Sequence, residues 1–138
     1  MPKFLIMVQA TQSDYDAMAG SPTPGYPAWD RETLTAMVEH MDGINRELSE
    51  AGELVDARGL AEPARAVVVT AGPDGSPTVS DRPYGADRPV LAGYWVIECA
   101  GPERAVEIAR RAYAAPMPEG STPTDVVVRP VEDEPPGT

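Results

Sequence analysis

The sequence predicts an α+β domain with a ferredoxin-like βαβββαβ order, in which two helices cover one face of an antiparallel sheet. Short apolar runs typical of strands are interrupted by two amphipathic helical segments, and a length of 138 residues suits one compact domain. We expect this single domain to span residues 1–131. Residues 132–138 are expected to form a flexible acidic tail, because acidic residues and prolines dominate there.

The first half of the chain predicts one strand and one helix, separated by a loop. Residues 4–8 form a short, unbroken apolar run, which fits a strand buried on both sides. Residues 11–28 are rich in Gly, Pro, Ser and Asp, so we expect a long loop there. The first helix should begin after Asp30, a good N-cap, and should end at Gly52. Its apolar residues recur at steps of three and four and form one stripe: Leu34, Met37, Met41, Ile44 and Leu48.

The second half predicts further strands around a second helix. We expect these strands at residues 53–60, 66–70, 78–80, 93–99 and 125–129, and the second of them carries the β-branched run Val67-Val68-Val69. The turn-forming residues 72–77 allow residues 78–80 to pair back as a short hairpin arm. The second helix should begin at Gly101-Pro102-Glu103, with proline at its first position and an acid near its positive end.

Two helices on one side leave the other sheet face bare. The hydrophobic residues available to occupy that face are Val67, Val69, Tyr94 and Trp95. Large exposed apolar patches usually mark interfaces, so we predict a homodimer with its sheets packed face to face.

Composition restricts the partners and the compartment. The formal net charge of -11, from 22 acidic and 11 basic residues, opposes binding along a phosphate backbone, so no nucleic acid partner is expected. Cys99 is the only cysteine, which excludes an intrachain disulfide and favours a structural thiol. No run has the roughly 18 apolar residues of a membrane span, and the apolar start is too short for a signal peptide. We therefore expect a cytoplasmic protein that does not enter a membrane.

Two residues are candidates for moving a proton. Asp81 is followed by Arg82 and, further on, by Arg88, so it should stay ionised and could accept a substrate proton, or it could simply form the turn before Pro83. His40, the sole histidine, lies at the edge of the apolar stripe of the first helix. It is either a solvated helix residue or a general base that faces a cleft.

Four further residues are candidates for substrate binding. Arg82 and Arg88 carry guanidinium groups suited to a carboxylate or phosphate, although a nearby acid such as Asp87 could pair with them instead. Tyr84 and Tyr94 could offer a phenol to a substrate, or could pack in a core or interface. A metal site is not predicted, because one His and one Cys far apart make no ligand motif. No residue pattern specifically requires a cofactor.

Several segments in the right order resemble a known family. The chain is similar to the YCII-related superfamily and its DGPF-domain branch in residues 3–8, 51–55, 80–84, 91–94, 103–105 and 128–131. The resemblance implies a dimeric α+β barrel of ferredoxin-like protomers, with clefts that would serve as active sites and some genomic association with extracytoplasmic-function sigma factors. The chain departs from the family motif where Arg82 replaces Gly, Tyr84 replaces Phe and Arg88 replaces Lys; Arg58 also stands where an acid is expected.

Two functions follow as hypotheses. The first is a small-molecule binding protein or a cofactor-independent acid–base enzyme of the isomerase, cyclase or lyase type, with a cleft near the Asp81–Tyr84 loop. In that enzyme Asp81 or His40 would move the proton, and Arg88 would stabilise developing negative charge. The alternative is a noncatalytic accessory or regulatory dimer linked to an extracytoplasmic-function sigma factor. Both rest mainly on family analogy, and the sequence leaves open whether the protein is an enzyme.

Overall fold

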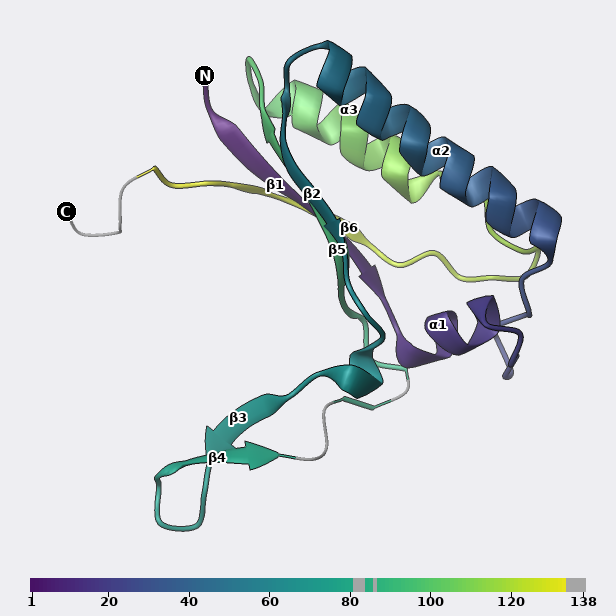
Figure 1. The fold of residues 1–138 in the computed structure, drawn as a ribbon, viewed down its shortest axis with the longest axis vertical. Coiled ribbons are helices and arrows are strands. Elements are labelled where there is room, and N and C mark those ends of the chain that lie inside the picture. The colour runs from purple at the N-terminus through teal and green to yellow at the C-terminus, as the bar shows by residue number, and fades with distance from the viewer. Residues whose placement is uncertain (81–83, 86, 134–138) are drawn as a thin grey trace.

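The computed structural model describes residues 1–80, 84–85 and 87–133, which form an α+β arrangement around a four-stranded antiparallel sheet (Figure 1). The main sheet has the strand order β2-β5-β1-β6, and each neighbouring pair is antiparallel. Strands β3 and β4 form a separate hairpin that projects from the body (Figure 1). The elements are, in chain order, β1 (Lys3–Ala10), α1 (Gln12–Met18), α2 (Arg31–Glu50), β2 (Leu54–Gly59), a short 3-10 helix (Pro63–Arg65), β3 (Val68–Ala71), β4 (Pro77–Ser80), β5 (Val90–Glu98), α3 (Pro102–Tyr113) and β6 (Val126–Pro130).

The predicted strands and the two predicted helices are confirmed, but the hairpin does not join the main sheet. Residues 68–71 and 77–80 pair only with each other in the described chain, with Val69 opposite Val79. The α+β class is therefore confirmed. The main sheet has four strands, because β3 and β4 form their own two-stranded sheet.

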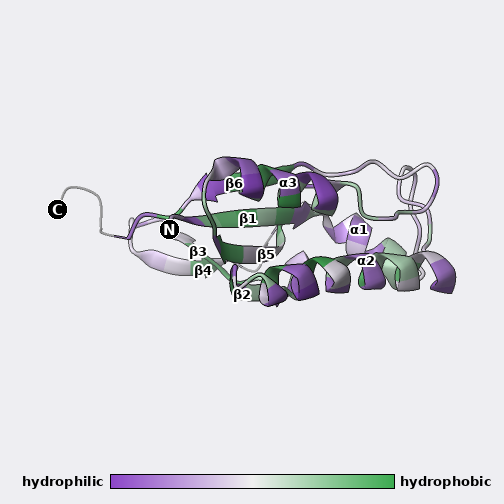
Figure 2. Ribbon diagram, turned by 90° about the horizontal axis from the view of Figure 1, so that it is seen from above, coloured by the Kyte–Doolittle hydropathy of each residue, from purple (hydrophilic) through white to green (hydrophobic). Residues whose placement is uncertain are grey.

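Both long helices cover the same face of the main sheet (Figures 1 and 2). Alternate residues of β1 and β5 point into this layer, because successive strand side chains face opposite sides. The stripe predicted on α2 supplies Ile44 and Leu48 to the core, and α3 supplies small alanines that allow close packing. The buried core consists of Phe4, Ile6, Ile44, Leu48, Trp95, Ile97, Cys99, Ala105, Ile108, Ala109 and Ala112.

The ends of α2 follow the predicted chemistry. The Asp30 carboxylate accepts the backbone N–H of Thr33 at 2.7 Å, which satisfies one of the unpaired donors of the first turn. At the other end Gly52 adopts a φ of 71°, a left-handed conformation that glycine reaches without strain. None of the described helices combines the length and the apolar character needed to cross a membrane.

The prediction of a loop over residues 11–28 was wrong for its first part, because residues 12–18 form α1. Thr11 and Asp14 make a capping box: Thr11 Oγ1 accepts the Asp14 N–H at 3.0 Å, and the Asp14 carboxylate accepts the Thr11 N–H at 2.8 Å. The prolines lie beyond Met18 and so do not prevent this helix, which ends where Gly20 adopts a left-handed φ of 97°. A turn with a bridge between Thr23 and Tyr26 follows.

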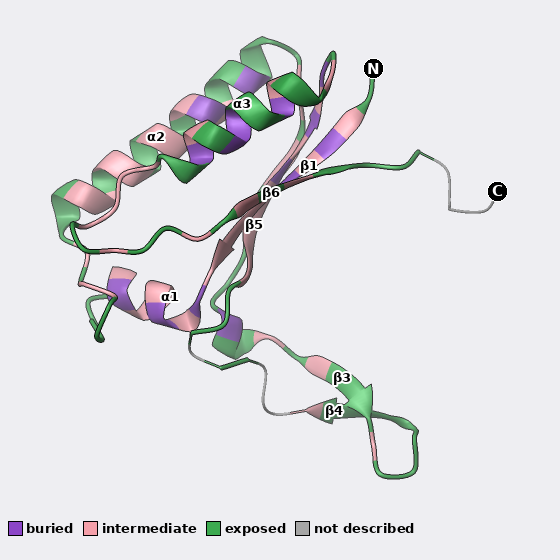
Figure 3. Ribbon diagram, turned by 180° about the vertical axis from the view of Figure 1, so that it is seen from behind, coloured by how far each residue is buried: buried purple, intermediate pink, exposed green. Residues whose placement is uncertain are grey.

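The face of the main sheet opposite the helices carries no described helix (Figure 3). Two of the residues expected there are elsewhere: Val67 and Val69 lie exposed at the hairpin. Trp95 was also misplaced by the prediction, because it points into the helix-covered core and is 6% exposed. Tyr94 does lie on the uncovered face, and its half-buried neighbours there include Leu5, Met7 and Val96.

Candidate ligand-binding site

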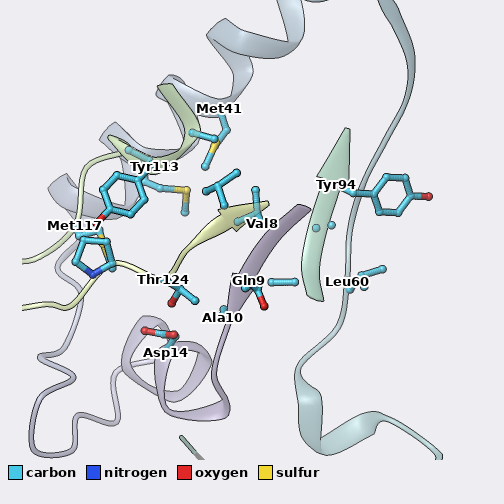
Figure 4. Close-up of a pocket in the computed structure, with 18 of the residues that line it drawn as sticks. Val8, Gln9, Ala10, Asp14, Met41, Leu60, Tyr94, Tyr113, Met117 and Thr124 are labelled. Atoms are coloured by element: carbon cyan, nitrogen blue, oxygen red, sulfur yellow. The ribbon is translucent and has the colours of Figure 1, made fainter. Parts of the chain in front are cut away.

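A cavity of about 470 Å³ lies on the helix side of the sheet, beyond the end of the core. Its walls come from the C-terminal half of β1, from α1, from the middle of α2, from parts of β2 and β5 and from residues 112–126 (Figure 4). Cavities of roughly 300–1,000 Å³ are typical of small-molecule sites. The size therefore suits a small organic ligand.

Sulfur and aromatic side chains dominate the wall. Four of the six methionines of the chain line the cavity, and both tryptophans do so too. Methionine is flexible and polarisable, and its sulfur packs well against aromatic rings. The wall is therefore suited to a flat, apolar ligand. These residues are Met18, Met37, Met41 and Met117 with Trp29, Trp95 and Tyr113.

Few polar groups reach the cavity, and some of them are already bonded. The Trp95 indole N–H donates to Asn45 Oδ1 at 2.6 Å, which leaves the Asn45 amide N–H groups for other partners. Gln9 Nε2 donates to the backbone carbonyl of Asp125 at 3.0 Å and ties β1 to the segment before β6. These two hydrogen bonds hold the side chains of Asn45 and Gln9 in place at the cavity wall.

Helix α1 brings a carboxylate and a phenol to the cavity. Oδ2 of Asp14 accepts both bonds from Thr11, and Oδ1 has no partner in the described chain. The Tyr15 hydroxyl donates to the Leu60 carbonyl at 2.9 Å, which anchors α1 to the end of β2. Burial raises the pKa of Tyr15, and the nearby charges of Asp14 and Glu62 raise it further. This end of the cavity therefore has a negative electrostatic environment.

Gly93 allows a close approach of β5 to β2 beside the cavity. A Cβ at this position would lie 3.0 Å from the backbone oxygen of Arg58, closer than ordinary contacts allow. The adjacent part of β1 shifts register between Val8 and Gln9. Such an irregularity changes the twist and the direction of side chains. Together these features shape the strand ends that line the cavity.

The described candidates in and after the sequence-predicted loop, Tyr84 and Arg88, lie outside the cavity wall. Asp81 and Arg82 are outside the described residues. The Arg88 guanidinium stacks over the Tyr84 ring at 5.1 Å, and both side chains are exposed. The loop is attached to α1 by a bond of 2.9 Å from the Ser13 hydroxyl to Asp87.

The other two predicted residues do not face the cavity either. His40 Nε2 lies 2.7 Å from the backbone oxygen of Arg111, so the imidazole joins α2 to the C-terminal turn of α3. The Tyr94 side chain points away from the cavity (Figure 4), and its hydroxyl donates to Asp56 at 3.1 Å. That bond raises the pKa of Tyr94. The structure therefore brings none of the described candidates into the cavity wall by its side chain.

The residues that do line the cavity had a signal in the sequence. Met37 and Met41 belong to the apolar stripe that the sequence predicts on α2. Their residue type, rather than their spacing, distinguishes them from Ile44 and Leu48. Asp14 also had a signal, since Thr11 and Asp14 have the spacing of a capping box.

Comparison with known proteins shows similarity to an uncharacterized protein but no family. No family model matches the chain. An uncharacterized protein of Rhizobium meliloti (strain 1021) is 28% identical over 94 residues, which cover 68% of this chain and 75% of that protein. The similarity extends over most of both chains.

Proposed function

We propose that this protein binds a small, flat, largely apolar molecule in the cavity between α1, α2 and the sheet. The observation that carries the proposal is the wall of methionine and aromatic side chains around about 470 Å³. A cavity with this lining gains most from burying apolar and aromatic surface. The proposed site is this cavity rather than a cleft near the Asp81–Tyr84 loop. A catalytic role would need a proton donor or acceptor at the wall, where Asp14 and Tyr15 are the available groups.

Binding of naphthalenemethanol, a neutral aromatic probe, tests this function. We expect chemical-shift changes in an amide NMR titration that cluster around the cavity, with a dissociation constant between about 1 mM and 10 μM for a ligand of this size. The variant Ala115→Trp should abolish binding, because Ala115 lines the cavity. The matched control is Ala114→Trp, whose position is exposed and outside the wall. Equal binding by both variants would place the probe elsewhere and contradict the proposal.

We also propose membership of the YCII-related superfamily, with a ferredoxin-like protomer. The strand order β2-β5-β1-β6 and the two helices on one face support it, because this is the order of a split βαβ fold. Because no family model matches, the proposal rests on this topology and on the residues that carry the resemblance.

A face-to-face homodimer is the corresponding assembly proposal. Its support is the uncovered sheet face, where Leu5 and Met7 of β1 lie beside Val96 of β5 and Val127 of β6. Light scattering at micromolar concentration should give twice the chain mass. The variant Met7→Lys should give the monomer mass, whereas Thr35→Lys on the exposed side of α2 should not. A monomer for the unaltered chain would refute the dimer and leave the cavity proposal intact.

A further inference from the structure

The cavity has an uncompensated negative charge at one end. Asp14 lines it, and Figure 4 places the Asp14 side chain at the edge of α1 nearest Thr124. Its Oδ2 is used by Thr11, while Oδ1 has no partner among the described residues. A carboxylate oxygen that borders an apolar cavity can accept a strong bond from a charged donor.

No described cation balances this charge from the cavity side. Arg58 is the only basic residue among those that line the cavity in the described chain, and it pairs with Asp56 at 3.3 Å. Both side chains lie on the sheet face opposite the helices, because Ala57 between them packs against the core. Arg88 stacks on Tyr84 outside the wall. An anionic ligand would therefore meet a carboxylate without a facing cation.

The rest of the wall also favours a positive group. The aromatic residues Trp29 and Tyr113 line the same cavity, and the faces of aromatic rings attract cations. The formal net charge of -11 adds a long-range attraction for cationic molecules. The cavity therefore complements a protonated aromatic amine: its apolar and aromatic lining suits the ring, and the free carboxylate oxygen suits the ammonium group.

We propose that the ligand is an aromatic molecule that carries a protonated amine, with its ring among the methionines and its ammonium group bound to Asp14. This inference rests on the proposed binding function and names its ligand class. It differs from the sequence-based expectation, in which Arg82 and Arg88 would bind an anion. Asp14 is here a binding residue for the ammonium group.

Three probes of nearly equal size separate the alternatives: naphthylmethylamine, naphthalenemethanol and naphthoic acid. We expect the amine to bind about tenfold more tightly than the alcohol, since a hydrogen bond between two charged groups is stronger than one from a neutral hydroxyl. The acid should bind most weakly. Asp14→Asn should reduce the amine preference to near one while the alcohol still binds. Asp16→Asn is the matched control, because it removes the same charge from α1 at a position outside the wall.

A further variant separates loss of charge from loss of the helix. Thr11→Val breaks the capping box but keeps the Asp14 carboxylate, so it should retain the amine preference. If the alcohol and the amine bind equally to the unaltered protein, the ammonium proposal is wrong and the apolar binding function stands. Tightest binding of the acid would overturn it in the same way. If no probe binds, the binding function fails, and the ligand class fails with it.

Discussion

Replacing Arg104 with methionine should destabilise the protein without altering the cavity. Arg104 lies at the start of α3 and donates to Glu53, with Nη2 2.8 Å from Oε1 and Nε 3.1 Å from the same oxygen. It also contacts Glu47 of α2 at 3.0 Å and Glu107 of α3 at 3.2 Å. The bonds to Glu53 raise the pKa of Arg104, so this guanidinium stays charged. It therefore joins α3 to α2 and to the start of β2.

The size of the effect follows from the exposure of the two partners. The Arg104 side chain is 22% exposed and the Glu53 side chain 15%, so the pair is partly shielded from water. Losing hydrogen bonds between charged groups costs roughly 1.5–3 kcal/mol, below the 3–5 kcal/mol of a fully buried pair. Methionine keeps much of the apolar contact. We expect a loss of about 2 kcal/mol, which corresponds to roughly 7 °C in Tm for a chain of this length.

Urea denaturation followed by circular dichroism measures this loss, and Arg111→Met is the control. Among the described residues the Arg111 guanidinium contacts the exposed carboxylate of Glu47 alone, so its replacement should cost less than about 1 kcal/mol. A double-mutant cycle with Glu53→Gln isolates the coupling of the shielded pair. If the coupling is zero, or if Arg111→Met costs as much as Arg104→Met, the assignment of the stabilisation to Arg104 and Glu53 is refuted.

Three further outcomes are expected from the contacts described above. Asn45→Ala removes the acceptor of the Trp95 indole and should cost about 1–2 kcal/mol in urea denaturation, with a changed near-UV spectrum; an unchanged stability would contradict the bond. Ser13→Ala removes the attachment to Asp87 and should speed amide exchange in residues 87–91, whereas equal rates would show that the bond does not hold this loop. The hydrogen bond from the backbone N–H of Thr33 lowers the pKa of Asp30. The capping carboxylate therefore stabilises the fold above the ordinary carboxyl pKa of about 4, and this stabilisation is lost as the pH falls through the lowered pKa of the folded state. Asp30→Ala should therefore make Tm depend less steeply on pH in the acid range, and an unchanged dependence would contradict this prediction.

The elements with strong local signals could be predicted from the sequence. Asp30 and Gly52 fix the two ends of α2 by side-chain capping and by backbone freedom, both of which are local properties. The short helix α1 was missed because the composition of residues 11–28 was averaged over two different segments. The Thr11–Asp14 capping box was the stronger signal, since it acts within one turn.

The position of each element in the sheet was less accessible. The hairpin of β3 and β4 was predicted as a pair, but its separation from the main sheet depends on contacts far apart in sequence. Trp95 and Tyr94 are neighbours in an apolar strand that could be buried on either side. Only the register against β1 and β2 decides that Trp95 faces α2, where Asn45 accepts its N–H.

The site was missed because one apolar stripe on α2 contributes both to the core and to the cavity wall. With 20 residues α2 is about 30 Å long, whereas the 12 residues of α3 span about 18 Å, and Figure 1 shows α2 extending past α3. Ile44 and Leu48 lie where both helices cover the sheet and are fully buried. Met37 and Met41 lie nearer the N-terminal end of α2 and line the cavity, and Met41 also packs against the edge of the core. Periodicity cannot separate these halves, because a core and an apolar cavity both need nonpolar residues. The change from branched aliphatic residues to flexible methionines along one helix face is the feature that marks the transition.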